Sequence, residues 1–304
     1  MNAAASSFLE VSPAPVPVPV PTAAETPEFE LLLASCSDIS DADLEQCLRT
    51  NISQGLHWDE LLRLAEHHRL IPRAYARLSA IAGVPPEFLR ALRSRYQTHA
   101  RQALWFTSEL INIVAHFEDR GIEVLSYKGP ALAEALYADV TMRQFGDLDL
   151  LVRPIDVPRA KASLLDLGYA SSVQFTEREE RAHLASGYEY TFDGPLGRNL
   201  VELKWQILPR FYTINFDVDA MFRRATTVKL GGRSLRTLCP EDLLLVLCIH
   251  AAKHGWSQLS WLCEITKLAQ QPLDWSVIEE QSKNLGIERI VAVNFLLAHK
   301  LLGT

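Results

Sequence analysis

The spacing of hydrophobic and polar residues divides the chain into three stretches. Over residues 28–120, apolar residues recur at steps of three, four or seven, which is typical of helices with one buried face. Short runs of strand type follow over 121–238, and a helical spacing returns over 239–304. The pattern therefore predicts an α+β protein, in which a small mixed β-sheet core is flanked by N-terminal and C-terminal helical regions.

The middle stretch contains the strand signals. Apolar runs over 122–127 and 145–152 predict two strands, and a helix over 131–137 is expected between them, with Pro130 at its first position. Turn residues rich in glycine predict two hairpins further on. These hairpins pair 188–192 with 200–205, and 228–230 with 234–238.

The two ends of the chain differ in pattern. Residues 1–27 contain alternating prolines, which lack a backbone donor and favour an extended conformation, so we expect a disordered Pro-rich tail. A proline-recognition segment is the alternative for this tail. At the other end, Pro240 and two acids begin a helix, and further helices are expected over 261–270, 276–285 and 287–302.

Composition narrows the functional classes. The 304 residues include 30 Lys and Arg against 37 Asp and Glu, a net charge of −7, which argues against non-specific nucleic-acid binding. The 5 cysteines form no CxxC pair and predict free thiols in a reducing compartment. No basic residue precedes Arg49, and the longest strongly apolar run, Leu243–Ile249, is shorter than a membrane span. We expect a cytoplasmic protein that does not associate with membranes.

The strongest candidate for chemistry is the pair Asp147 and Asp149. Residues two apart on a strand project from the same face, so their carboxylates stand side by side and repel each other unless a cation lies between them. Carboxylates on a rigid strand suit Mg²⁺, which also binds substrate phosphates. A pair of exposed acids at a strand entrance is the alternative for this motif alone.

A turn upstream of the pair favours phosphate binding. Lys128 and Gly129 separate a predicted strand from a helix start, where backbone amides and the helix dipole attract anions. Lys128 can contribute a point charge to a phosphate, or it is an exposed turn lysine. Arg143, in the loop before the second strand, either holds phosphate or pairs with an acid, and we expect phosphate.

A third acid is expected from a later strand. Glu202 and Lys204 alternate with Val201 and Leu203, so this strand has one charged face and one apolar face. A charged edge strand explains the segment equally well. With the aspartate pair, however, Glu202 completes the set of carboxylates that metal-assisted nucleotidyl transfer needs, in which two metal ions stabilise the attacking and leaving oxygens.

His250 and His254 lie one helical turn apart, but no third zinc ligand accompanies them. We expect this helix to pack against the sheet, with His250 and Lys253 near the triphosphate. A buried, hydrogen-bonded histidine is the alternative for either ring.

Taken together, these motifs resemble an uncharacterised nucleotidyltransferase family within the polymerase-β-like superfamily. The resemblance covers most of the chain beyond residue 27. Its motifs are Tyr127–Leu132, Leu136–Tyr137, Arg143, Gly146–Val152, Leu167–Tyr169, Val201–Trp205 and Pro240–Trp261, with a helical lead-in at Trp58, Leu61, Leu62, Ala65, His68 and Pro72.

The resemblance implies an enzyme with a nucleoside triphosphate, normally ATP, as donor. Asp147 and Asp149 would bind two Mg²⁺ ions together with Glu202, and Gly129 would face the phosphates beside Lys128, Arg143, Lys204, His250 and Lys253. A nucleotidyl group, most often adenylyl, would pass to an acceptor with release of pyrophosphate. The acceptor is expected to be a small molecule, a peptide or a protein rather than a nucleic acid.

Two departures from the family pattern bear on this function. Lys128–Gly129 replaces the superfamily's Gly-Ser turn, and Glu202-Leu203-Lys204 stands where many relatives carry Asp-x-His. A catalytically degenerate nucleotide-binding or regulatory module of the same fold is therefore the alternative. A helical interaction protein, whose acids are only solvated, is a third class.

Overall fold

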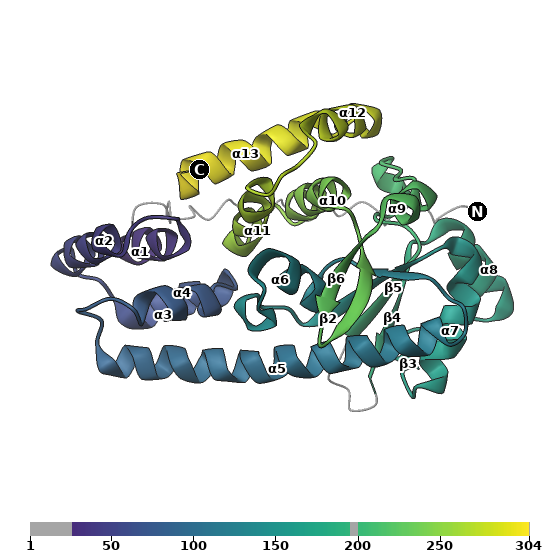
Figure 1. Ribbon diagram of the computed structural model, residues 1–304, viewed down its shortest axis with the longest axis horizontal. Helices are drawn as coiled ribbons and strands as arrows, with labels where there is room; N and C mark the ends of the chain where they lie inside the picture. Colours follow the sequence, from purple (N-terminus) through teal and green to yellow (C-terminus); the bar gives the residue numbers. More distant parts are fainter. Residues whose placement is uncertain (1–25, 195–199, 304) are drawn as a thin grey trace, which may run out of the picture.

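The structure is a computed structural model that describes residues 26–194 and 200–303. It shows an α+β protein in which a small mixed sheet lies between helices from both ends of the chain, as predicted. The long helix α5 runs along the N-terminal helices and along the sheet (Figure 1). The predicted tail falls almost entirely outside the described residues. Its expected end at residue 27 overlaps helix α1, which begins at Pro27.

Five helices form the N-terminal part, and polar caps define the first two. The Thr26 hydroxyl accepts a hydrogen bond from Phe29 N at 3.3 Å, and Ser40 caps the second helix in the same way, which satisfies backbone donors that have no intrahelical partner. Proline begins the long fifth helix, where its missing donor costs nothing. The helices are α1 (Pro27–Cys36), α2 (Asp41–Ser53), α3 (Trp58–His67), α4 (Ile71–Leu78) and α5 (Pro86–Glu118).

The sheet has five strands in the order β1-β2-β5-β4-β3, with only β2 and β5 parallel. The predicted pairing of 188–192 with 200–205 is confirmed as β4 and β5, although residues 195–199 of their connection lie outside the described residues. The strands are β1 (Val124–Ser126), β2 (Asp147–Val152), β3 (Ala170–Ser171), β4 (Glu189–Asp193) and β5 (Leu200–Lys204).

Several boundaries differ from the sequence prediction. β1 is only three residues long, β2 begins at Asp147 rather than Phe145, and α6 (Gly129–Tyr137) begins one residue before Pro130. α8 (Glu177–Ser186) was not predicted, because none of its residues is buried and it has no apolar face. Instead, a reciprocal capping box between Thr176 and Glu179 defines its start.

The remaining elements of the described residues are further helices and a second hairpin. The predicted second hairpin is confirmed, and both glycines of its turn, Gly231 and Gly232, have positive φ angles of 54° and 81°. The helices are α7 (Val157–Asp166), α9 (Val218–Arg224), α10 (Pro240–Lys253), α11 (Leu259–Ala269), α12 (Trp275–Leu285) and α13 (Glu288–Leu302), and the hairpin is β6 (Thr226–Leu230) with β7 (Arg233–Thr237).

The two faces of the sheet pack against different helices. Leu148, Leu150 and Val152 of β2 belong to the apolar cluster that contains α5 and α7, whereas Leu151 belongs to the cluster that contains α10. Because side chains alternate along a strand, Asp147 and Asp149 face the same side as Leu151. The acids of β2 therefore project toward the side of the sheet that α10 covers.

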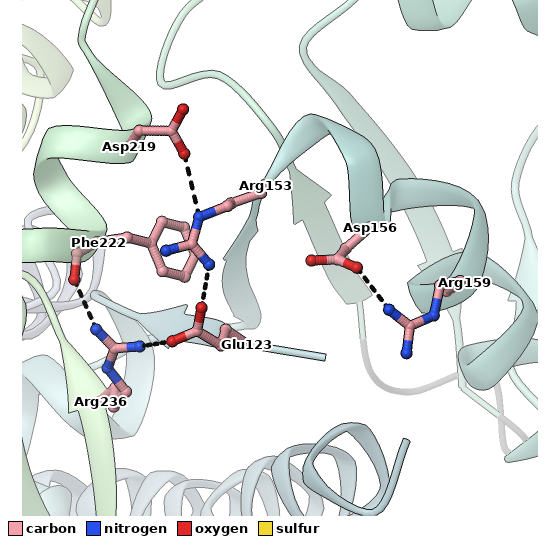
Figure 2. A network of polar contacts seen from close by, with 7 residues as sticks. All are labelled: Glu123, Arg153, Asp156, Arg159, Asp219, Phe222 and Arg236. Carbon is pink, nitrogen blue, oxygen red and sulfur yellow. Dashed lines mark hydrogen bonds and ion pairs between the residues drawn. The ribbon is translucent and has the colours of Figure 1, made fainter. Parts of the chain in front are cut away.

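A charged network closes the edge of the sheet next to β1. Arg153, directly after β2, contacts Glu123 and Asp219, and its guanidinium lies 4.2 Å from the centre of the Phe222 ring (Figure 2). Arg236 of β7 also contacts Glu123 and donates to the Phe222 carbonyl. These contacts join α9 and β7 to the ends of β1 and β2.

No helix among residues 26–194 and 200–303 combines the length and the apolar composition that a membrane crossing requires.

Candidate active site

Three carboxylates converge where β2 and β5 run side by side. Asp149 and Glu202 are direct partners in the parallel register, and Asp147 precedes Asp149 by two residues. Carboxylate oxygens of Asp147, Asp149 and Glu202 all lie within 4.8 Å of one another. The structure therefore brings together the three acids that the sequence singled out, on the face of the sheet toward α10.

Asp149 is at the centre of this group and is buried. Its Oδ1 atom lies 3.1 Å from Lys204 Nζ and 3.7 Å from Lys128 Nζ, and it accepts a hydrogen bond from the Tyr127 hydroxyl at 3.4 Å. The other oxygen, Oδ2, is buried without a hydrogen-bond partner among the described residues. A buried acceptor without a partner is costly, so this atom fits a cation ligand.

Lys204 is the most highly connected cation of the site. Its ammonium lies 2.6 Å from Glu202 Oε2, 3.1 Å from Asp149 Oδ1 and 3.1 Å from Glu189 Oε2. Burial disfavours the charged form, but Tyr127 and these carboxylates outweigh it, so the pKa of Lys204 lies well above its ordinary value. Lys204 therefore stays protonated and fixes carboxylates of both β4 and β5.

The three acids have different electrostatic environments. Burial raises the pKa of Asp147, and the neighbouring charge of Asp149 raises it further. Burial also raises the pKa of Glu202, although Lys204 opposes the shift. Asp149 has a lowered pKa, because Lys128 and Lys204 together overcome its burial. Asp149 is therefore the permanently ionised member of the group.

The turn before α6 lies directly against the start of β2. Gly129 adopts a left-handed φ of +54°, and a β-carbon there would lie 3.2 Å from the carbonyl oxygen of Asp147. The N-terminus of α6 has no side-chain cap, so its first amides have no side-chain acceptor. The backbone next to the acids therefore has amide donors that an anion could bind, and phosphate binding here stays a prediction.

Lys128 faces inward rather than toward solvent. It is buried, and its ammonium lies 3.1 Å from Nδ1 of His250 as well as near Asp149. Burial and the adjacent Lys128 charge lower the pKa of His250 to about 2, so the imidazole is neutral and accepts from Lys128. The alternative of an exposed turn lysine is therefore wrong.

Lys253 and His254 lie at the border of the charged side chains around Asp149. The His250 and His254 rings are 4.8 Å apart and both pack on Trp261, which is the arrangement of packed aromatic side chains rather than of metal ligands. Lys253 Nζ lies 5.5 Å from the centre of the Tyr188 ring, and Lys204 approaches the same ring at 5.9 Å.

Arg143 pairs with an acid, which is the alternative to the phosphate contact that we expected. It is buried, and its Nε atom lies 2.9 Å from Oε1 of Glu264 on α11, a carboxylate that is also buried. The Nε and Nη2 atoms of Arg143 both donate to the Glu264 carboxylate. The structure thus favours pairing with an acid over the expected phosphate contact.

Sequence reasoning missed three side chains of the site. Glu189 is the first residue of β4 and Tyr188 directly precedes it, whereas Tyr127 directly follows β1. Glu189 is the register partner of Lys204 in the β4–β5 ladder. Aligning the predicted hairpin residue by residue would have revealed this pair, because opposite charges on paired strand positions signal contact.

A cavity of about 420 Å³ lies beside the loop that leads into β2, between α3, α4 and α5. Its wall ends at Gly146, the residue before Asp147. The size falls in the range of small-molecule sites, roughly 300–1,000 Å³. The wall combines apolar surface with polar and basic side chains, among them Arg69, Arg95, His99, Gln102 and Gln144.

A family model described as an uncharacterised nucleotidyltransferase matches residues 54–303. No curated protein matches the sequence.

Several solved structures show distant similarity. The antibiotic-resistance factor ANT(2'')-Ia has 16% identity and a TM-score of 0.44 over 64% of this chain and 98% of its own. The lincomycin-bound lincosamide antibiotic adenylyltransferase LnuA has 15% identity and a TM-score of 0.38 over 54% of this chain and 96% of its own. An antigenic nucleotidyltransferase-like protein from Paracoccidioides brasiliensis has 15% identity and a TM-score of 0.32 over 65% and 91%.

The family match begins directly after α2, includes α3 to α13, and contains every acid and lysine of the site. The chain belongs to the family of uncharacterised nucleotidyltransferases and is a transferase of that class.

Proposed function

We propose that this protein transfers a nucleoside monophosphate, AMP, from a nucleoside triphosphate to a hydroxyl group of a small molecule, with release of pyrophosphate. The observation that carries the proposal is the convergence of Asp147, Asp149 and Glu202 on one face of the sheet, with a buried and unpartnered oxygen on Asp149. Such an oxygen set is the kind that Mg²⁺ binds in nucleotide sites.

Asp147, Asp149 and Glu202 would hold the metal, and the N-terminus of α6 at Gly129 would receive the triphosphate. Bound Mg²⁺ would neutralise charge on the transferred phosphoryl group and on the leaving pyrophosphate. The acceptor oxygen bonds to the α-phosphorus, the bond from this phosphorus to the β-phosphate oxygen breaks, and the hydroxyl proton passes to a carboxylate oxygen of the site.

The acceptor would approach through the cavity that ends at Gly146, since this cavity leads to the residue before Asp147. Its volume suits a small molecule rather than a folded macromolecule. Arg69, Arg95 and the amide side chains of Gln102 and Gln144 would favour an acceptor rich in oxygen atoms.

The first prediction tests the metal-dependent transfer. The protein is incubated with Mg²⁺, each labelled nucleoside triphosphate and cell extract, which is divided into a small-molecule filtrate and the retained macromolecules. We expect pyrophosphate release with ATP and the filtrate, and a fall of about 10²–10³-fold in Asp147→Asn and Asp149→Asn, because each loses a charge that balances the metal.

Asp156→Asn is the matched control, because Asp156 pairs with Arg159 at 2.8 Å, outside the site, and should leave the rate unchanged (Figure 2). Equal rates in all four proteins would remove the aspartates from the mechanism. Nucleotide binding without pyrophosphate release would favour the regulatory module of the same fold, and activity with the retained fraction would contradict the small-molecule acceptor.

A further inference from the structure

The carboxylates of the site already hold one fixed cation, the ammonium of Lys204. Its three hydrogen atoms match three carboxylate oxygens, at 2.6 Å in Glu202 and 3.1 Å in both Asp149 and Glu189. The lysine side chain is buried, and residues of three neighbouring strands, β2, β5 and β4, hold its ammonium. A divalent ion that bridges Asp149 Oδ1 and Glu202 Oε2 would have to displace this ammonium.

Other carboxylate oxygens of the group accept no hydrogen bond within the described part of the chain. Asp149 Oδ2 has no partner, and the carboxylate of Asp147 accepts no hydrogen bond from any described residue. These atoms can share a single ion between the two aspartates of β2, to which Glu202 can add the oxygen that does not contact Lys204. The structure therefore separates the group into an ammonium position, at Lys204, and an open cation position, at Asp147 and Asp149 Oδ2.

The balance of charge among these side chains also indicates one divalent cation. The carboxylates of Asp147, Asp149 and Glu202 lie within 4.8 Å of one another, and that of Glu189 contacts Lys204. These four acids face the two ammonium groups of Lys128 and Lys204. Four negative and two positive charges leave two negative charges before a nucleotide binds. One divalent cation cancels this excess, and a second would place an uncompensated double charge in a buried site.

We propose that Lys204 occupies the place of a second metal ion, so that the carboxylates of this protein hold one divalent cation rather than two. The inference rests on the proposed function, because it assumes that these carboxylates bind a metal. Lys204 then acts as a permanent positive charge at the active site, held in position by Glu189, and it determines how many ions the site accepts.

The test counts bound ions rather than activity. Purified full-length protein without nucleotide is titrated with Mn²⁺, and the free ion is measured by its electron paramagnetic resonance signal. We expect one Mn²⁺ per wild-type chain and two per chain in Lys204→Met, because loss of the ammonium frees Asp149 Oδ1, Glu202 and Glu189. Lys204→Arg keeps the charge and should bind one.

Lys161→Met is the matched control, since Lys161 also pairs with a glutamate, Glu180, at 2.5 Å but lies outside the site, so this variant should bind one ion. A second measurement needs only the wild type, in case Lys204→Met does not fold. Crystals grown with Mn²⁺ and a non-hydrolysable ATP analogue should show one anomalous peak at the carboxylates.

Two ions on the wild type, or a single ion on folded Lys204→Met, would overturn the inference and leave the proposed function standing. Absence of Mn²⁺ binding in the wild type, with and without the analogue, would overturn both.

Discussion

Gly129 shows how one residue without a side chain positions the site. Its φ of +54° lies in the left-handed region, and the carbonyl of Asp147 is only 3.2 Å from the place of a β-carbon. The turn can therefore approach the first residue of β2 closely. This approach places the N-terminus of α6 beside the acids.

Substitution of Gly129 tests this close approach. In Gly129→Ala we expect a loss of more than about 1–2 kcal/mol in the free energy of unfolding, because the left-handed backbone penalty adds to crowding against Asp147. Gly286→Ala is the matched control, since Gly286 has a φ of +69° with open space around it, and it should show the backbone penalty alone. Urea unfolding measures both, and equal losses would contradict the crowding.

The alternation of side chains along a strand explains why the sequence could predict which face of β5 carries Glu202. Val201 and Leu203 are buried in the α5 cluster, and Glu202 and Lys204 face the other side, as the sequence pattern indicated. The pattern held because one face of β5 must be apolar to pack against the core. It did not show whether the charged face was exposed or covered by α10.

At the scale of elements, a buried ion pair joins α11 to the loop that leads into β2. Arg143 and Glu264 are both buried and contact each other at 2.9 Å. They lie 121 positions apart in the sequence. This separation is why the sequence left the partner of Arg143 undetermined.

Breaking this pair should destabilise the protein. Glu264→Gln leaves the Arg143 charge buried without compensation, which costs about 3–5 kcal/mol in the free energy of unfolding. Glu60→Gln removes a carboxylate from an exposed pair with Arg63 and should have a much smaller effect, because water screens that pair. Denaturant unfolding compares the two variants, and similar losses would show that Arg143 has another partner.

At the scale of the whole molecule, the two ends of the chain share one apolar cluster. Leu259, Leu262, Cys263 and Leu302 pack among side chains of α1 to α5. Backbone hydrogen bonds accompany this packing, since Ser260 N donates to the His68 carbonyl and Leu259 N to His68 Nδ1. The N-terminal helices are therefore part of the structure that supports α11.

His68 makes this contact dependent on pH. Burial, with a smaller contribution from His67, lowers the pKa of His68 to about 4 from its ordinary value of 6.5. Because the folded state disfavours the proton, the stability from neutral His68 is complete above pH 6.5 and is lost as the pH falls toward 4. We expect a loss on the order of 1–2 kcal/mol between pH 7 and pH 5.

His68→Gln serves as the comparison, because glutamine can accept the hydrogen bond from Leu259 N but does not titrate. Urea unfolding at both pH values should show that this variant loses less stability than the wild type. The same loss in both proteins would mean that His68 does not titrate as the structure indicates.

The sequence by itself predicted most of the helices and strands, the nucleotidyltransferase family and the acids Asp147, Asp149 and Glu202, because strand alternation and local motifs are written in neighbouring residues. The tertiary structure decided which charges meet. Lys204 with Asp149, Lys128 with His250 and Arg143 with Glu264 are contacts between separate elements, whose register and packing determine them. Local patterns carry no information on such distances, so the single-cation hypothesis could come only from the folded chain.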